Sequence, residues 1–310
     1  MRLIKPSFKI LKQEEDYLGV CKQIELAGRT CYKSEDRITE TSAKEFVDKM
    51  IKSGHGAMLE HGTIYLKYDS QYNKDLECIQ VLDKEELNEI KSFIRKYQEN
   101  KYSKINYNKN DIRWILVTTN LRVLVENDWL DDLQYICEST EYHEKRVTAK
   151  FICDRGVSHE FVRHRVFSFA QESTRYCNYS KDKFGNDCTF IIPCWLDEAD
   201  LIDEFGDLNS LEYHKDIEKF QSSEWSDAAN FLQSIAWSES NYLTLLDNEW
   251  TPQQARSVLP NSLKTELVMT GFVSDWKGFF TLRDSNAAHP QARELAIPLK
   301  EEFINLNLIK

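Results

Sequence analysis

The pattern of hydrophobic and polar positions predicts helices and strands in mixed order along the 310 residues of the chain. Helices are expected over residues 13–32, 42–53, 83–100, 119–137, 221–247 and 275–282, with a last helix from Pro290. Strands are expected over residues 63–68, 147–153 and 263–270, and a polar loop over 101–111. Because the elements do not alternate regularly as strand, helix and strand, their order favours an α+β or mixed α/β fold.

Local signals predict where some helices begin and end. Ser42 and Glu45 have the spacing of a capping box, and Gly54 suits the C-terminal cap of the same helix. Thr251, Pro252 and Gln254 predict another helix start, with Thr as N-cap, Pro at the first helical position and Gln completing the box.

Composition indicates a folded globular protein without a membrane-spanning segment. Hydrophobic residues make up 41% of the chain and aromatic residues 12%, which is typical of folded domains. No stretch approaches the roughly 20 apolar residues of a membrane helix, and the N-terminus does not resemble a secretory signal, so we expect a cytoplasmic protein. The eight cysteines include no C-x-x-C pair and are expected to be free thiols rather than zinc ligands.

The net charge of −11 disfavours polyanionic partners, but it is unevenly distributed. Residues 196–227 carry a charge of −9, which leaves −2 for the rest of the chain. A basic pocket elsewhere in the chain is therefore compatible with the composition.

Basic side chains without any lysine gather between residues 155 and 176. They are Arg155, His159, Arg163, His164, Arg165 and Arg175. The segment is expected to be helical, with His159 and Arg163 on one side. Guanidinium groups suit planar, bidentate binding of phosphate or carboxylate better than ammonium groups do. On spacing alone, a surface helix that forms ion pairs with Glu160 and Glu172 is the slightly favoured interpretation.

A motif within this segment reverses that preference. Arg163-His164-Arg165, seven residues, Ser173, Thr174 and Arg175 match the R-H-R-x7-S-x-R signature, so the chain resembles the flavin-dependent thymidylate synthases. Gly54–His61 resembles the family's G-H-x-S/T-x-x-E-H, and Ala255–Pro260 resembles its A-R-x-V-L-P. Leu282-Arg283 resembles a later L-R. The resemblance covers about residues 42–66, 146–195 and 250–297.

The resemblance implies a fold, a reaction and an assembly. The fold would be one domain over residues 1–310, with a central antiparallel-rich sheet flanked by helices and insertions at about 69–145 and 196–245. The reaction would be methylation of dUMP to dTMP, with methylenetetrahydrofolate as one-carbon donor and NADPH-reduced FAD as hydride source. The assembly would be a homotetramer with shared active sites. No metal, nucleic acid polymer or membrane is expected as a partner.

The resemblance also implies roles for residues at the matching positions. Those expected to bind dUMP are Glu160, Arg163, Gln171, Glu172, Ser173, Thr174, Arg175, Arg256 and Arg283. Those expected to line FAD are His55, Arg163, His164, Arg165 and Gln171. Arg283 and Ser173 are the expected catalytic residues. Arg283 would stabilise negative charge on the uracil as its N3 ionises, and Ser173 would position the substrate rather than act as a nucleophile.

The chain departs from the family pattern at several flavin and nucleotide positions. Ala57 replaces a Ser or Thr that usually contacts the flavin, and Glu160 replaces a frequent Gln beside the nucleotide. Phe272, Ser274 and Gly278 stand where the family has polar residues. Flavin contacts from residues 272–278 are therefore in question.

Two other functions are compatible with parts of the sequence. One is a non-catalytic RNA-binding module that stacks bases on Phe167, Phe169 and Tyr176, although the acidic charge disfavours it. The other is a different flavoenzyme that acts on an anionic substrate. Pro193-Cys194 resembles the nucleophile segment of the flavin-free thymidylate synthases, but Trp195 follows, and a buried structural cysteine is the favoured interpretation. Neither a G-x-G-x-x-G motif nor a P-loop is present.

Overall fold

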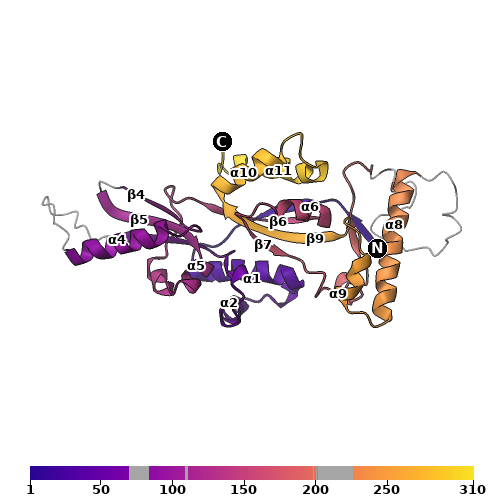
Figure 1. Cartoon of the computed structure of the whole chain (residues 1–310), viewed down its shortest axis with the longest axis horizontal. Coiled ribbons are helices and arrows are strands. Elements are labelled where there is room, and N and C mark those ends of the chain that lie inside the picture. Colours follow the sequence, from indigo (N-terminus) through magenta and orange to yellow (C-terminus); the bar gives the residue numbers. More distant parts are fainter. Residues whose placement is uncertain (70–83, 109–110, 198, 200, 202–225) are drawn as a thin grey trace.

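The computed structural model describes all residues except 70–83, 109–110, 198, 200 and 202–225. The described residues form three sheets and the helices that pack on them. A four-stranded sheet lies in the middle of an elongated molecule, with a three-stranded sheet towards one end and a long helix, α8, towards the other (Figure 1). Within the described ranges, no helix is long and apolar enough to span a membrane.

The central sheet is antiparallel throughout, with strand order β2-β6-β9-β7. Its strands are β2 (Ser7–Leu11), β6 (Arg146–Asp154), β9 (Lys264–Phe272) and β7 (Ser168–Gln171). The predicted strands at 147–153 and 263–270 are confirmed, and so is the mixture of helices with antiparallel sheets. β2 and β7 were not predicted, because β7 has only four residues and β2 is partly exposed.

One face of the central sheet packs against the helices α6 (Arg155–Phe161), α10 (Val273–Arg283) and α11 (Pro290–Asn305). Alternate residues of β6 point into this layer, so that Phe151 meets Trp276 of α10, and Trp276 in turn meets Phe303 of α11. The buried Trp276 also donates a hydrogen bond from Nε1 to the carbonyl of Val147 at 3.1 Å. This aromatic core fixes α10 against the strand.

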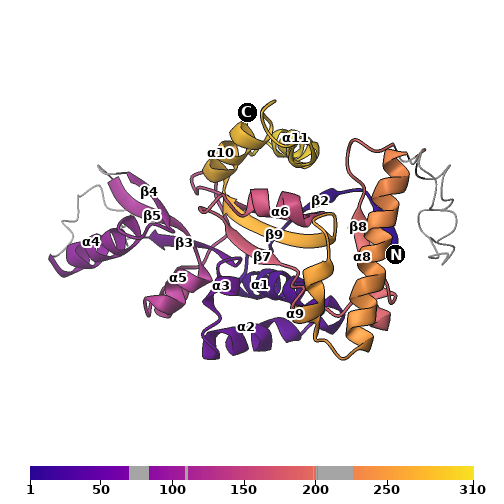
Figure 2. The ribbon, with the colours of Figure 1, turned by 45° about the vertical axis from the view of Figure 1, so that its right-hand side comes forward.

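The opposite face is covered by α1 (Tyr17–Tyr32) and the short α3 (Gly56–Leu59), and α2 (Ser42–Lys52) packs on the outer side of α1, as Figures 1 and 2 show. Ala27 of α1 packs against Ala170 and Val268 of the sheet. A Cβ atom on Gly28 would lie only 2.5 Å from the Phe46 ring, so a glycine is needed where α1 crosses α2.

The three-stranded sheet has the order β3-β5-β4 and lies beside α4 (Lys84–Gln98). Its strands are β3 (Thr63–Asp69), β5 (Asp111–Asn120) and β4 (Lys104–Asn108). The predicted strand 63–68 is confirmed, and so is the helix 83–100 from Lys84, since residue 83 lies outside the described residues. The loop predicted at 101–111 contains β4, and β5 was missed. The helix predicted at 119–137 is wrong over much of its length, because it divides into α5 (Leu121–Glu126) and a 3₁₀ helix (Leu130–Tyr135).

A separate hydrophobic cluster forms around α8 (Asp227–Asp247) at the far end of the molecule. It includes Leu3 of β1 (Arg2–Ile4) and Phe190 of β8 (Thr189–Ile191), which pair in parallel. The predicted helix 221–247 is confirmed from Asp227, and residues 221–225 lie outside the described residues. A short helix α9 (Pro252–Ala255) and a 3₁₀ turn (Arg256–Val258) follow α8.

Predictions about helix ends met mixed outcomes. The box at Thr251 and Gln254 is confirmed, as is Gly54, which has φ of 70°. The box at Ser42 is wrong, because Ser42 lies inside α2 and its hydroxyl hydrogen-bonds Glu25 at 2.9 Å and accepts from the Thr39 N–H. The remaining helices predicted at 13–32, 275–282 and from Pro290 are confirmed.

Candidate active site

The Arg-rich segment begins as α6, whose first turn is fixed by Asp154. One carboxylate oxygen of Asp154 accepts from the Val157 N–H at 2.6 Å, and the other accepts from Nε2 of Gln291 in α11 at 2.6 Å. α6 ends at Phe161, with Val162 as its C-cap. The predicted helix therefore ends before Arg163, which lies in the turn after it, but His159 and Arg163 do lie on one side, because both line one cavity beside α6.

Arg283, the last residue of α10, joins that turn to α6. Its Nε donates to Nε2 of His164 at 2.9 Å, and its Nη1 donates to the Glu160 carboxylate at 2.9 Å. Its Nη2 donates to the Glu160 main-chain carbonyl at 2.6 Å. Arg163 also approaches Glu160, with 3.5 Å between Nη1 and Oε1. We call these four residues the Arg283 cluster.

The Arg283 cluster holds His164 neutral. Partial burial and then the positive charge of Arg283 lower the pKa of His164 to about 4. Because Nε2 accepts the hydrogen bond from Arg283, the proton of the neutral ring is on Nδ1. The hydrogen bond from Arg283 in turn lowers the pKa of the Glu160 carboxyl, which stays ionised at neutral pH. The cluster thus presents two guanidinium groups, one carboxylate and one imidazole N–H.

A second group of predicted residues lies in the turn after β7. The Ser173 N–H donates to the carbonyl of Cys31 in α1 at 2.9 Å, and the Ser173 hydroxyl accepts from the Arg175 N–H at 3.3 Å. The Thr174 hydroxyl accepts from Nη1 of Arg256 at 3.2 Å. We call Ser173, Thr174, Arg175 and Arg256 the β7 turn cluster. It places a hydroxyl beside a guanidinium, a combination that suits phosphate oxygens.

The Glu172 side chain is buried and holds this turn against the sheet. It is 1% exposed and accepts from Lys264 Nζ at 2.8 Å and from the Tyr179 hydroxyl at 3.1 Å. Lys264 also contacts Glu266 at 2.7 Å, and Glu266 accepts from Lys33 at 2.8 Å. Burial alone would lower the pKa of Lys264, but Glu172 and Glu266 outweigh it and raise that pKa. The lysine is therefore charged.

Gln171, just before the β7 turn cluster, joins β7 to α6, the helix that carries Glu160. Its Nε2 donates to the hydroxyl of Ser158 in α6 at 2.8 Å and to that of Thr265 in β9 at 3.2 Å. These two hydrogen bonds from Nε2 hold β7 against α6 and β9.

Two predicted flavin residues belong to neither cluster. His55 is exposed at the start of α3, and its side chain does not cap that helix. Arg165 is exposed, and among the described residues no carboxylate lies within ion-pair distance of it or of Arg175. The guanidinium of Arg175 lies 5.3 Å from the centre of the Tyr176 ring. These side chains face outwards with donors available to a ligand or a second subunit.

The buried lysine–glutamate network was missed by the sequence interpretation. Lys264 and Glu266 alternate in a strand that was correctly predicted, so they share one face. Two opposite charges on one face of a buried strand could have indicated this network from the sequence. Lys33, the partner of Glu266, and Tyr179, which donates to Glu172, could not have been found, because they come from distant segments.

A cavity of about 560 Å³ lies beside α6. Glu160 and Arg163 of the Arg283 cluster line it, together with His159, Asn261 and His289. The β7 turn cluster does not contribute to it. The cavity therefore adjoins one half of the predicted site only.

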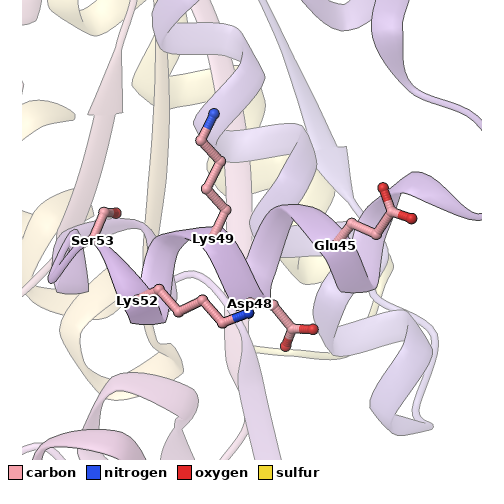
Figure 3. Close-up of a pocket in the computed structure, with 5 residues that line it drawn as sticks. All are labelled: Glu45, Asp48, Lys49, Lys52 and Ser53. Atoms are coloured by element: carbon pink, nitrogen blue, oxygen red, sulfur yellow. The ribbon is translucent and has the colours of Figure 1, made fainter.

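A hollow of about 400 Å³ runs along α2 and contains none of the predicted residues. Its lining comes entirely from α2 and the residue after it (Figure 3). The side chains of Lys49 and Asp48 extend in opposite directions from the helix rather than towards a common point. This arrangement is that of a solvated helix face.

Comparison with known proteins supports one family for this geometry. The flavin-dependent thymidylate synthase of Corynebacterium glutamicum is 33% identical over 144 residues, which are 46% of this chain and 51% of that protein. That of Mycobacterium tuberculosis is 31% identical over 147 residues, 46% of this chain and 51% of that protein. The chain thus spans about half the length of these relatives.

A solved UMP/dUMP methylase, PolB from Streptomyces cacaoi, covers 99% of this chain and 93% of its own at 16% identity, but its TM-score of 0.41 is too low to support a conclusion. The family model for "Thymidylate synthase complementing protein" matches residues 135–306, which include both clusters and Gln171 but not His55. Because that match covers more than half of the chain, this protein belongs to the family of thymidylate synthase complementing proteins.

Proposed function

We propose that this chain is a flavin-dependent thymidylate synthase that methylates dUMP to dTMP. In this proposal methylenetetrahydrofolate donates the one-carbon unit and NADPH reduces FAD. The observation that carries the proposal is the contact of Arg283 with His164 and Glu160. It joins two motif segments that are 119 residues apart in the chain.

The β7 turn cluster is the proposed site for the phosphate of dUMP. The exposed guanidinium of Arg175 lies over the Tyr176 ring and has no carboxylate partner among the described residues, where Arg256 donates only to the Thr174 hydroxyl. A nucleotide phosphate carries two negative charges and several acceptor oxygens, which two guanidinium groups and two hydroxyls can meet. Ser173 is a positioning group in this scheme, because its hydroxyl already accepts from the main chain at Arg175.

Arg283 is the proposed partner of the uracil ring. A guanidinium stays protonated, so it can stabilise negative charge on the ring without losing its own proton. Its side chain is only 14% exposed, which strengthens its interaction with a developing charge. His164, neutral and protonated at Nδ1, has one further hydrogen-bond donor, on the ring edge that faces away from Arg283.

The described residues fit a bound flavin in part. Arg163 and Arg165 are exposed donors that suit a pyrophosphate, and Gly278 leaves open space above α10, where a Cβ atom would meet no atom within 4 Å. Phe272 is buried against the core and offers no polar group. We therefore propose that Arg163, His164 and Arg165 hold the FAD. His55 lies at the start of α3 on the opposite face of the sheet, so in this proposal it contacts FAD only in a site shared between subunits. When bound and reduced, the flavin supplies the hydride.

The outward orientation of these side chains supports a site completed by other subunits. Arg163 is 71% exposed, and Arg165 and Arg175 are exposed as well. We propose a homotetramer with shared sites, for which light scattering is the direct measurement. A monomer that still turns over dUMP would rule out sharing.

The decisive experiment measures release of tritium from 5-tritiated dUMP by the purified chain. We expect release that depends on NADPH and on methylenetetrahydrofolate, and a flavin absorption spectrum that changes when dUMP is added. Arg175→Ala should bind dUMP much more weakly, with Arg95→Ala on the distant helix α4 as control. Absence of tritium release from flavin-loaded protein would exclude the proposed reaction.

A further inference from the structure

Glu160 pairs with both arginines that lie near it. Its Oε2 is 2.9 Å from Nη1 of Arg283, and its Oε1 is 3.5 Å from Nη1 of Arg163. One carboxylate thus partly neutralises Arg283, which the proposed function places at the uracil ring, and Arg163, which it places at the FAD. An anion that approaches either guanidinium also approaches this carboxylate, and like charges repel.

The contacts of Arg283 do not depend on the Glu160 carboxylate alone. Its Nε is held by His164, and its Nη2 is held by the main-chain carbonyl of residue 160. If the carboxylate turned away, these two hydrogen bonds would still keep the guanidinium in place, and Nη1 would become free to donate to another acceptor.

The Glu160 carboxylate can turn away from Arg283 at a modest cost in free energy. The side chain is 30% exposed and lies in the last turn of α6, beside the cavity of about 560 Å³. The other charges that face it are Arg163 and the more distant His289, both exposed. Because water can reach the carboxylate, turning outwards requires little desolvation and no rearrangement of the core.

We propose that Glu160 is an internal counter-ion that competes with the anionic groups of the ligand for Arg163 and Arg283, and so limits the affinity of this chain for anionic nucleotides. This inference rests on the proposed function for the identity of the nucleotide. Whatever the nucleotide, removal of the charge at residue 160 strengthens anion binding at these arginines.

Glu160→Gln tests the proposal, because the amide oxygen can still accept from Arg283 while the charge is lost. Calorimetric titration of the full chain with dUMP should show a dissociation constant about fivefold lower than in the wild type, the scale on which partly exposed ion pairs act. The matched control is Glu99→Gln, which removes an exposed pair with Arg95 at 2.9 Å on α4. It should leave dUMP affinity unchanged.

A second titration uses inorganic phosphate and does not assume the nucleotide. The imidazole signals of His164 report occupancy by NMR, because His164 contacts Arg283. Tighter phosphate binding in Glu160→Gln but not in Glu99→Gln supports the counter-ion, even if dUMP fails to bind the wild type and the proposed function falls. Unchanged or weaker phosphate binding in Glu160→Gln overturns the inference, and so does unchanged or weaker dUMP binding when the wild type binds dUMP.

Discussion

Replacing Lys264 by Met should destabilise the fold strongly. Lys264 is 15% exposed and lies between Glu172 and Glu266. Without it, Glu266 keeps Lys33 and Lys150 as partners, but within the described part of the chain Glu172 keeps only the Tyr179 hydroxyl. Breaking a buried pair by removing one partner leaves an uncompensated charge and costs about 3–5 kcal/mol. We expect Lys264→Met to lower the free energy of unfolding by about this amount.

Urea denaturation followed by circular dichroism measures the change, and a double variant tests its cause. Lys264→Met combined with Glu172→Leu removes both charges, so the double variant should be more stable than Lys264→Met alone. A loss below about 1 kcal/mol in the single variant would refute the reasoning. So would a double variant that is no more stable than the single one.

The same substitution should affect the proposed site. Glu172 immediately precedes Ser173, and its main-chain N–H donates to the Glu266 carbonyl at 2.8 Å. Loss of the Lys264 contact would loosen the β7 turn cluster. We therefore expect the KM for dUMP to rise in Lys264→Met protein that is still folded at low temperature, with a smaller change in kcat.

Three further predictions address single contacts. Arg283→Ala should lower kcat in the tritium-release assay about 100-fold or more, because a donor to developing charge is lost; wild-type turnover would exclude that role. NMR should show His164 neutral down to about pH 4. Its folded pKa lies below the unfolded value near 6.5, so its contribution to stability is present above pH 6.5 and lost as the pH falls towards 4; an ordinary titration would contradict the contact with Arg283. Gly271→Ala would place a Cβ atom 2.4 Å from the Phe167 ring and should lower the stability of the fold by about 1–3 kcal/mol, as measured by thermal melts. An unchanged melting temperature would contradict this prediction.

Alternating apolar residues in β6 and a long apolar run in β9 made these central strands predictable, whereas mixed signals misplaced other elements. β6 and β9 have long runs of buried residues and were found. β5 was missed because no element was predicted over 112–118, and its last two residues were assigned to the helix expected over 119–137. The capping box at Ser42 failed because the Ser42 hydroxyl is used by Glu25, a partner that only tertiary packing brings near.

The residues of the candidate site were easier to predict than their partners. The motif identified Arg163, His164 and Arg283, but only the fold brings the end of α10 against the turn after α6. Likewise, the motif included Glu172, yet its burial against Lys264 depends on the antiparallel pairing of β7 with β9. Sequence patterns identify chemical groups, and the topology decides which groups meet.

The order of strands in the central sheet has a consequence for how the protein folds. β2 pairs with β6, and β6 pairs with β9, so contacts in one sheet join residues near 10, 150 and 270. Closing such long loops before the pairing gains any free energy slows folding. During synthesis, one edge of β6 would remain unpaired until β9 emerges from the ribosome. Over that interval the apolar strand β6 could associate with other chains.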